Sequence, residues 1–439
     1  MIQYNRQESF NENINRLFPT GVMLALNSGG CRELTFQITD ACNLACTYCY
    51  QTHKHHNVMP IEIAKKAVDC LFDDNYKINN YYDASKLTGI VLDFIGGEPF
   101  LEIDLIDEIM EYFVQQAILH KSILAHRYRI SLCSNGVLYF EPNVQKFINK
   151  WRDKLSLSIS IDGCKELHDM CRVFPDGTGS YDIAIKAANA EREINHELST
   201  KMTIAPNNVS YLFNAIKNLV EVRYEQIFFN CVFEKGWEIE HAKELYNQSK
   251  LVSDYLIPLE KSPYISFFDE RLCCPLAPED NRNWCGGTGL MLAVDYKGDF
   301  YPCLRYMESS VGDRVEPYII GNVFDGIGKN QKTCDKISCL ECVTRRSQST
   351  DECFNCEIAK GCAWCSAYNY EEFGTVNKRA TYICIMHKAR ALANTYFWNK
   401  YFRYYKINKR FKLWLSDEEC LKIIDKEELE MLHQLEKED

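Results

Sequence analysis

The sequence predicts an α/β protein with a parallel sheet, followed by a small cysteine-rich domain and C-terminal helices. Between about residues 31 and 230, short β-branched runs alternate with longer amphipathic stretches. After Cys273 the chain changes to short elements that are rich in cysteine. Alternation of strands and helices indicates βα units and a parallel sheet, whose reacting groups gather at the carboxyl ends of the strands.

The individual elements follow from their hydrophobic periods. Short runs rich in Val, Ile, Leu and Phe indicate buried strands, and apolar residues that recur every three or four positions indicate helices. The expected strands are 34–38, 90–95, 128–133, 155–161, 201–204 and 226–229. The expected helices are 61–72, 103–117, 142–151, 183–194 and 211–222.

These elements and the change in composition divide the chain into five expected segments. We expect the segment of about thirty residues before the first strand to be too short for a separate folded domain. The tail beyond Trp414 is rich in Glu and Lys, and we expect it to be an exposed helix. The segments are an N-terminal extension (1–30), a core of six βα units (31–240), a helical connector (241–272), the cysteine-rich domain (273–400) and a C-terminal helical tail (401–439).

The composition limits the class of protein. A chain of 439 residues with 46% hydrophobic and 25% charged residues is typical of a globular protein with two domains. It has no apolar run long enough for a membrane span and no secretory signal, so we expect a cytoplasmic protein. A formal charge of −11 argues against a nucleic-acid partner. Twenty-two cysteines without an export signal favour iron–sulfur ligation over disulfides.

Three cysteines follow the first expected strand in the pattern C-x3-C-x-aromatic-C. They are Cys42, Cys46 and Cys49, called here the N-terminal trio. A cubane [4Fe–4S] cluster has four irons, so three thiolates leave one iron free to bind a substrate or cofactor. His53, His55 and His56, just beyond the trio, could also suggest a metal site, but we expect a solvated loop there.

The run Gly96-Gly97-Glu98-Pro99 follows the second expected strand. Its two glycines allow positive φ and a close approach of the backbone to a ligand. Taken alone, the run could be an ordinary turn at a strand end. Its place about fifty residues after the N-terminal trio favours a ligand-binding loop.

Polar residues also follow the third and fourth expected strands. Ser134, Asn135 and Ser160 carry hydroxyl and amide groups that suit a ribose or a carboxylate, although such residues also serve as helix caps and turns. Arg172 could bind a carboxylate through its planar guanidinium, or it could form a structural ion pair. Both interpretations stay open for each residue.

A second concentration of cysteines lies in the C-terminal part of the chain. Cys285 is followed by Gly298 and Cys303, and then by the run Cys353-x2-Cys356-x5-Cys362-x2-Cys365 and by Cys384. A zinc site is the structural alternative, built from Cys339, Cys342, Cys353 and Cys356. Most other cysteines are expected to be buried small hydrophobes. These are Cys31, Cys70, Cys133, Cys164, Cys171, Cys231 and Cys420.

The N-terminal trio and the Gly-Gly-Glu-Pro run together resemble the signature of the radical S-adenosylmethionine (SAM) enzymes. The resemblance implies a partial (β/α)6 barrel similar to a TIM barrel, with a [4Fe–4S] cluster on the trio and SAM chelated by the free iron. Cleavage of SAM would give a 5′-deoxyadenosyl radical that abstracts hydrogen from an unactivated C–H bond. The SAM contacts implied are Tyr48, Gly96, Gly97, Glu98, Pro99, Ser134, Asn135, Ser160 and Arg172.

The C-terminal cysteines resemble the SPASM domain, in which two auxiliary [4Fe–4S] clusters are bound. The sequence departs from the SPASM pattern because two residues rather than three separate its last closely spaced pair, Cys362 and Cys365. The resemblance implies one cluster on Cys285, Cys303 and Cys365 (the C-terminal trio) and another on Cys353, Cys356, Cys362 and Cys384 (the C-terminal quartet).

The cluster of the C-terminal trio has no obvious fourth ligand. Cys273 or Cys274 could supply it, although both lie further upstream than the pattern suggests. If neither does, one iron is open and could bind a cysteine thiolate of the substrate, as in thioether-forming relatives. Cys334, Cys339 and Cys342 are further candidate ligands.

Segments 344–353 and 361–370 resemble radical SAM/SPASM peptide maturases of the thioether-forming (ranthipeptide) type. The resemblance implies an oxidoreductase that acts on a ribosomally made precursor peptide with cysteine motifs, aided by a flavodoxin- or ferredoxin-type electron donor. The adenosyl radical would remove hydrogen from an acceptor carbon, and the substrate thiolate would attack the carbon radical. The auxiliary clusters would take up the surplus electron, and no nucleic acid or membrane is implied.

Two alternatives stay open. An anaerobic sulfatase-maturing enzyme, which makes formylglycine, shares both domains but needs no thiolate on a cluster. A non-catalytic iron–sulfur electron carrier is the second alternative. The three-cysteine loop with Gly-Gly-Glu-Pro argues against the carrier.

Overall fold

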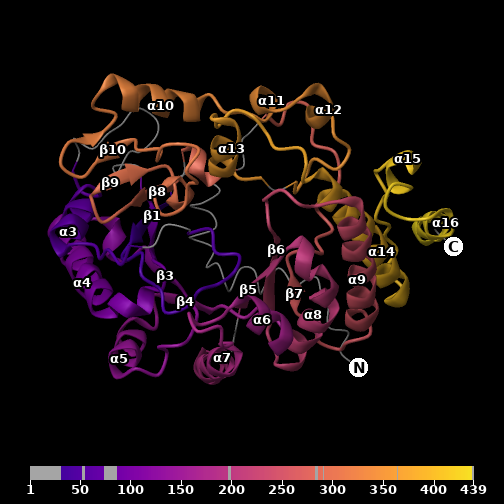
Figure 1. Ribbon diagram of the computed structural model, residues 1–439, viewed down its shortest axis with the longest axis horizontal. Coiled ribbons are helices and arrows are strands. Elements are labelled where there is room, and N and C mark those ends of the chain that lie inside the picture. Colours follow the sequence, from indigo (N-terminus) through magenta and orange to yellow (C-terminus); the bar gives the residue numbers. More distant parts are fainter. Residues whose placement is uncertain are drawn as a thin grey trace.

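The computed structural model describes residues 31–51, 55–73, 87–195, 199–281, 285–289, 291–362 and 364–437. Its strands form an arc from β1 to β7, with helices along the outer side of the arc (Figure 1). Four strands pair in parallel and in chain order: β1 (Cys31–Gln37), β2 (Gly89–Ile95), β3 (Tyr128–Ser134) and β4 (Leu155–Ile159). A second parallel sheet contains β5 (Ser199–Ile204), β6 (Gln226–Cys231) and β7 (Tyr264–Ile265).

The predicted α/β class is therefore confirmed, and all six expected strands are present with slightly different ends. The helices that follow the strands include one, α6, that the hydrophobic pattern did not predict. They are α3 (Ile61–Asp69), α4 (Ile103–Leu119), α5 (Pro142–Trp151), α6 (Lys165–Cys171), α7 (Tyr181–Asn195), α8 (Leu212–Glu221) and α9 (Ile239–Leu256).

The two faces of the sheet differ in polarity because strand side chains alternate. Phe36 on β1 stacks on Phe94 of β2 with ring centroids 5.3 Å apart, and both are fully buried in the core. The opposite face carries polar groups, and the Thr35 hydroxyl donates to the Glu33 carboxylate at 3.3 Å. The core therefore lies between the strands and the outer helices, and the inner face of the arc is polar.

The cysteine-rich part continues the first sheet. Strand β8 (Met291–Val294) pairs in parallel with β1, and β9 (Asp299–Tyr301), β10 (Gly321–Asn322) and β11 (Gly326–Ile327) follow in antiparallel order. One sheet thus joins the core to the segment that carries the C-terminal cysteines, above the arc in Figure 1. Four helices belong to this segment: α10 (Gln331–Glu341), α11 (Arg345–Gln348), α12 (Asp351–Phe354) and α13 (Ser366–Phe373).

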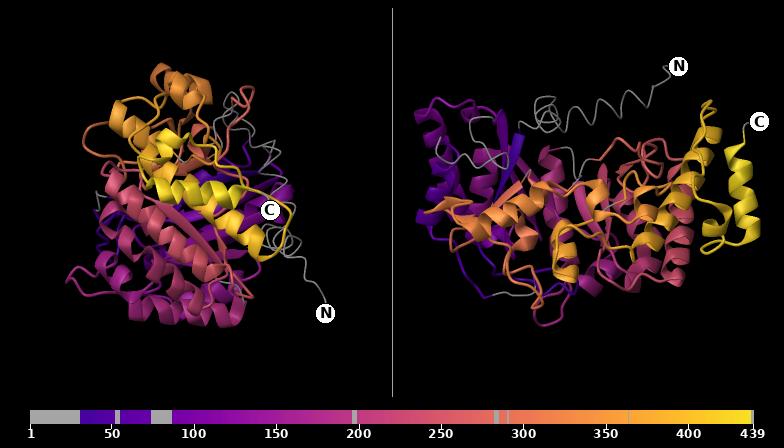
Figure 2. Two further views of the ribbon diagram at one scale, coloured as in Figure 1. Left: turned by 90° about the vertical axis from the view of Figure 1, so that its right-hand side faces the viewer. Right: turned by 90° about the horizontal axis from the view of Figure 1, so that it is seen from above.

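The C-terminal helices pack on the core instead of extending from it. Helix α14 (Cys384–Tyr404) lies along α9, and α15 (Asp417–Cys420) and α16 (Lys426–Glu436) lie beside α14 (Figures 1 and 2). The side chains of Cys420 and Leu432 are both fully buried. The expected terminal helix is present and is exposed on one face, whereas its other face carries apolar side chains that are buried. Among the described residues, no helix is both long and apolar enough to cross a membrane.

Candidate functional site

The loop of the N-terminal trio is held by the Gly-Gly-Glu-Pro turn. Backbone N–H groups of Gly97 and Glu98 donate to the carbonyls of Thr39 (3.1 Å) and Ala41 (2.9 Å). A Cβ on Gly97 would lie 2.2 Å from the Ala41 oxygen and 2.7 Å from Cβ of Cys42. Neither glycine has a positive φ. The expectation about φ is thus wrong, and the glycines are needed because the two loops touch.

The opposite side of the same loop is bound to the segment that follows β4. The N–H of Ala45 donates to the Val173 carbonyl at 2.7 Å, and the N–H of Thr47 donates to the Cys171 carbonyl at 2.9 Å. The cysteine loop is therefore fixed on both sides by backbone hydrogen bonds. Such fixing positions three thiols before any cofactor binds.

The three thiols of the N-terminal trio lie near one another. Burial raises the pKa of Cys46 to about 11, the nearby Arg172 opposes this rise, and Cys42 and Cys49 add to it. The side-chain nitrogen of Asn43, next to Cys42, is buried and has no hydrogen-bond acceptor among the described residues. Three thiols with an unsatisfied donor beside them fit a bound group that brings acceptor atoms.

Single metal ions fit this structure less well. Among the described residues, no group of three or more His, Cys, Asp or Glu side chains could hold a metal ion. The zinc alternative is not assembled, because Cys339, Cys342, Cys353 and Cys356 form no such group. In a four-iron cluster each thiolate binds a different iron, so ligands of a cluster stand further apart than ligands of one ion.

Glu98 connects the carboxyl ends of β2 and β3. Its carboxylate accepts hydrogen bonds from the Ser134 hydroxyl (2.8 Å) and from the N–H groups of Asn135 (2.8 Å) and Phe100 (3.1 Å). Burial raises the pKa of Glu98 to about 7, and these hydrogen bonds oppose the rise. Pro99 follows, at the start of a 3-10 helix (Pro99–Glu102). The carboxylate of Glu98 thus contacts protein groups, and its predicted SAM contact stays a prediction.

Asn135 and Ser160 lie at the same edge as the trio. The Asn135 side-chain nitrogen donates to Oδ1 of Asn43 at 2.7 Å, which connects β3 to the cysteine loop. The Ser160 hydroxyl lies 3.3 Å from Sγ of Cys133, and its N–H donates to the Ser134 carbonyl. The structure therefore brings the polar strand ends together beside the N-terminal trio.

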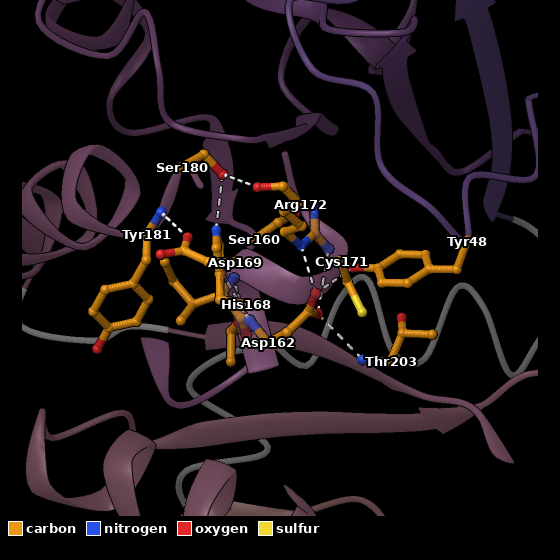
Figure 3. Close-up of polar contacts among 12 residues, drawn as sticks. Tyr48, Ser160, Asp162, His168, Asp169, Cys171, Arg172, Ser180, Tyr181 and Thr203 are labelled. Atoms are coloured by element: carbon orange, nitrogen blue, oxygen red, sulfur yellow. Dashed lines mark hydrogen bonds and ion pairs between the residues drawn. The ribbon is translucent and has the colours of Figure 1, made fainter. Parts of the chain in front are cut away.

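Asp162, which follows β4, gathers Tyr48 and Arg172 (Figure 3). Nε of Arg172 lies 2.8 Å from Oδ2 of Asp162, and the Tyr48 hydroxyl donates to the same oxygen. The guanidinium also lies over the Tyr48 ring, 5.5 Å from its centroid. Asp162 is fully buried. Of the two interpretations of Arg172, this geometry favours the structural ion pair.

His168 supports the same segment. Its Nδ1 accepts from the Asp162 N–H at 3.4 Å, and its Nε2 lies 3.0 Å from the Ser180 hydroxyl, which donates to the Arg172 carbonyl. Burial lowers the pKa of His168 to about 4, so the ring is neutral near pH 7. Figure 3 shows these contacts as one network that joins Asp162, His168, Arg172 and Ser180. Asp162 and His168 were not predicted as site residues, although Asp162 directly follows an expected strand.

Two members of the C-terminal trio, Cys285 and Cys303, lie beside Gly287. A Cβ on this glycine would lie 3.2 Å from Sγ of Cys303 and 3.6 Å from Sγ of Cys285. Burial raises the pKa of Cys365, and the neighbouring Cys285 thiol adds to this effect. The three cysteines expected to share a cluster are therefore close together, and a Cβ at position 287 would fit only tightly between two of them.

The C-terminal quartet is also assembled. Burial raises the pKa of Cys384 to about 12, and the nearby thiols of Cys362, Cys353 and Cys356 add to the rise. Cys273 lies near this group, because its N–H donates to the Lys360 carbonyl at 2.8 Å and its pKa is raised by burial and by neighbours that include Cys362.

Cys274 also lies near the loop of the quartet, because its carbonyl accepts a hydrogen bond from the Lys360 N–H at 2.9 Å. These main-chain hydrogen bonds place Cys273 and Cys274 beside the loop that carries the C-terminal quartet. They do not place either residue beside the C-terminal trio.

The remaining cysteines fall into two kinds. Cys339 and Cys342 on α10 are exposed, and the Cys334 thiol donates to the Gly328 carbonyl at 3.0 Å. The prediction of buried, small hydrophobic cysteines is confirmed for most of the others: Cys70, Cys164, Cys171, Cys231 and Cys420 are buried, and Cys133 is half-buried. The side chain of Cys31 and the whole of His53 lie outside the described residues, whereas His55 and His56 are exposed, as expected for a solvated loop.

Comparisons with known proteins agree with this geometry. Residues 36–219 match the sequence model of the Radical SAM superfamily. A cysteine-type anaerobic sulfatase-maturating enzyme of Clostridium perfringens is 23% identical over 312 residues, which cover 65% of this chain and 76% of that protein. The antilisterial bacteriocin subtilosin biosynthesis protein AlbA of Bacillus subtilis is 20% identical over 297 residues, 66% of this chain and 57% of AlbA.

A solved structure has the same fold. Native anSMEcpe, with bound AdoMet and the Kp18Cys peptide, superposes with a TM-score of 0.60 and 20% identity, covering 86% of this chain and 98% of that one. Residues 36–219 are thus similar to radical SAM domains, and the chain has an α/β fold like that of anSMEcpe, with relatives that include a sulfatase-maturating enzyme and a bacteriocin biosynthesis protein. Enzymes of this superfamily use SAM and a [4Fe–4S] cluster.

Proposed function

We propose that this chain is a radical SAM enzyme that modifies a ribosomally made, cysteine-containing peptide by joining a cysteine sulfur to a carbon atom of another residue. The observation that carries the proposal is the presence of two further cysteine groups, the C-terminal trio and the C-terminal quartet, each gathered around its own site. The trio supplies three thiols where a cubane cluster needs four ligands.

The N-terminal trio is the proposed site of the SAM-binding cluster. Cys42, Cys46 and Cys49 would each bind one iron, and the fourth iron would bind SAM, which supplies an adenosyl radical when it is cleaved. The surrounding residues do three things: Gly97 lets the loops touch, Asn135 holds the loop through Asn43, and the Arg172–Asp162 pair supports Tyr48. They would hold the reacting groups in one geometry.

The C-terminal trio is the proposed place where the substrate thiol is held. Cys285, Cys303 and Cys365 would leave one iron open, and we assign neither Cys273 nor Cys274 to it, since the main chain of both pairs with Lys360 in the loop of the quartet. Metal coordination deprotonates a thiol and fixes its position, which favours bond formation to a nearby carbon. Each crosslink removes one hydrogen atom from the acceptor carbon and one proton from the thiol, and the surplus electron passes to the bound clusters.

A second candidate function is the maturation of a sulfatase by oxidation of one cysteine or serine to formylglycine. The likeness to the sulfatase-maturating enzyme of Clostridium perfringens and to anSMEcpe favours it. This reaction needs SAM cleavage and electron removal, but no substrate thiolate on an open iron. A non-catalytic iron–sulfur carrier would not cleave SAM at all, so SAM cleavage by the reduced protein separates it from both enzymes.

The deciding experiment is co-expression with a small cysteine-rich peptide encoded beside this chain, followed by mass spectrometry. We expect the peptide to lose two hydrogens per event and to contain thiols that alkylating reagents no longer modify. A sulfatase peptide converted to an aldehyde under the same conditions would establish the second function instead. A Cys46→Ala variant is the matched control and should leave either peptide unchanged.

A further inference from the structure

Two buried hydroxyl groups lie beside the C-terminal trio and have no part in the proposed function so far. Ser366 directly follows Cys365, and its Oγ lies 3.1 Å from Sγ of Cys285. Tyr306 ends the 3-10 helix Leu304–Tyr306 that follows Cys303, and its hydroxyl lies near Ser366 but makes no hydrogen bond of good geometry among the described residues. The side chains of Ser366 and Tyr306 are both fully buried.

The position of Ser366 defines its role toward the ligand sulfur. A hydroxyl 3.1 Å from a sulfur is at hydrogen-bond distance, and a thiolate can only accept. The same hydroxyl is 3.4 Å from the place that a Cβ on Gly287 would occupy, within the group formed by the trio. Ser366 is therefore placed to donate to Cys285 rather than to bind an iron of its own.

Tyr306 is held with its hydroxyl close to the same sulfurs. Its ring packs against Tyr318 and Tyr370, with centroid distances of 5.2 Å and 6.1 Å. Burial raises the pKa of Tyr306 well above its usual range, the adjacent Cys303 thiol adds to the rise, and the Ser366 hydroxyl opposes it. A buried hydroxyl that makes no good hydrogen bond is unfavourable. A cluster on the trio would bring the sulfur acceptor that this hydroxyl lacks.

We propose that Tyr306 and Ser366 donate hydrogen bonds to sulfurs of the cluster on the C-terminal trio and thereby raise its reduction potential. This inference rests on the proposed function, because it requires that cluster. Hydrogen bonds to cluster sulfurs stabilise the more negative, reduced state. Tyr306 and Ser366 are thus positioning residues that make this cluster a better electron acceptor during crosslinking.

The test is a redox titration of the anaerobically purified full chain, followed by electron paramagnetic resonance. The signal of this cluster is the one lost in Cys285→Ala. At a fixed potential we expect Tyr306→Phe and Ser366→Ala each to lower the ratio of reduced to oxidised cluster about tenfold, which corresponds to a fall of about 59 mV in the potential of a one-electron couple. Iron and acid-labile sulfide per chain should not change.

Two matched variants separate hydrogen bonding from packing. Tyr318→Phe removes a hydroxyl from the same group of rings, but that hydroxyl already donates to the Lys336 carbonyl at 2.9 Å. Ser366→Thr keeps a hydroxyl at position 366. Both should titrate like the parent chain.

Unchanged potentials in both Tyr306→Phe and Ser366→Ala, with clusters intact, would overturn the inference while leaving the proposed function standing. A Cys285→Ala chain that keeps every cluster signal would instead remove the auxiliary cluster from the proposed function, and this inference with it.

Discussion

Arg172 and Asp162 form a buried ion pair, with Nε 2.8 Å from Oδ2, at the edge of the sheet where the N-terminal trio lies. Asp162 is fully buried and the Arg172 side chain is 12% exposed. The pair also receives the Tyr48 hydroxyl and the Thr203 N–H, which lies 3.3 Å from Oδ1. The segment after β4 and the cysteine loop are thereby connected through one carboxylate.

Replacing this carboxylate should destabilise the protein strongly. Asp162→Asn keeps the shape but leaves the charge of Arg172 without a partner, which typically costs about 3–5 kcal/mol. We expect a loss of that order in the free energy of unfolding, measured by denaturant titration. Lys65→Ala is the control, because it breaks the exposed Lys65–Glu108 pair and should cost less than about 1 kcal/mol. Equal losses in the two variants would contradict the importance of the buried pair.

Gly97→Ala should damage the cluster of the N-terminal trio selectively. The added methyl group would lie 2.2 Å from the Ala41 oxygen, so the cysteine loop must move. We expect a loss of iron and of SAM cleavage, measured by iron analysis and by the yield of 5′-deoxyadenosine. Gly177→Ala is the matched control. It adds a methyl group into open space at a positive φ of 86°, so it should cost stability without loss of iron.

Glu98 should make stability depend on pH. Burial raises its pKa from 4.5 to about 7, so the folded chain binds a proton more tightly than the unfolded chain. The contribution of Glu98 is then complete below about pH 4.5 and is lost as the pH rises through about 7, by up to about 3 kcal/mol.

The experiment compares thermal unfolding of the parent chain and Glu98→Gln between about pH 5 and pH 8. Over roughly this range the protonation of Glu98 should change the stability of the parent chain. We expect the parent chain to lose stability relative to Glu98→Gln as the pH rises. A constant difference between the two chains would show that Glu98 does not titrate in this range.

Substitutions in the N-terminal trio and in the C-terminal quartet should affect different steps of the reaction. Cys46→Ala should abolish SAM cleavage, because it leaves two thiols on the first cluster. Cys356→Ala should keep some cleavage but stop peptide modification, since it removes one ligand of the C-terminal quartet. Cys342→Ala, at an exposed position, should keep both activities. Both products are measured by mass spectrometry, and full peptide modification by either of the first two variants would refute the cluster assignments.

Much of the site was predictable because it depends on spacing within short segments. The three thiols at positions 42, 46 and 49 share one loop, and that loop follows a strand whose hydrophobic run is evident in the sequence. The C-terminal quartet was predictable for a similar reason, since three of its cysteines lie within ten residues. Local chain geometry keeps such residues near one another.

Other features could not be predicted, because they depend on contacts between distant segments. The need for glycine at position 97 arises from Ala41, and the partner of Arg172 was open until Asp162 was seen beside it. The apolar face of the C-terminal tail becomes evident only where Leu432 is buried.

The sequence by itself therefore determined the α/β class, the strands and which closely spaced cysteines lie near one another, since periodicity and short spacings act within a few residues. The tertiary structure alone decided which groups each carboxylate meets and that Cys273 and Cys274 lie with the quartet. It also decided that Tyr306 and Ser366 are buried beside the C-terminal trio. The physical reason is that burial and hydrogen bonding depend on segments that the folded chain brings together from far apart.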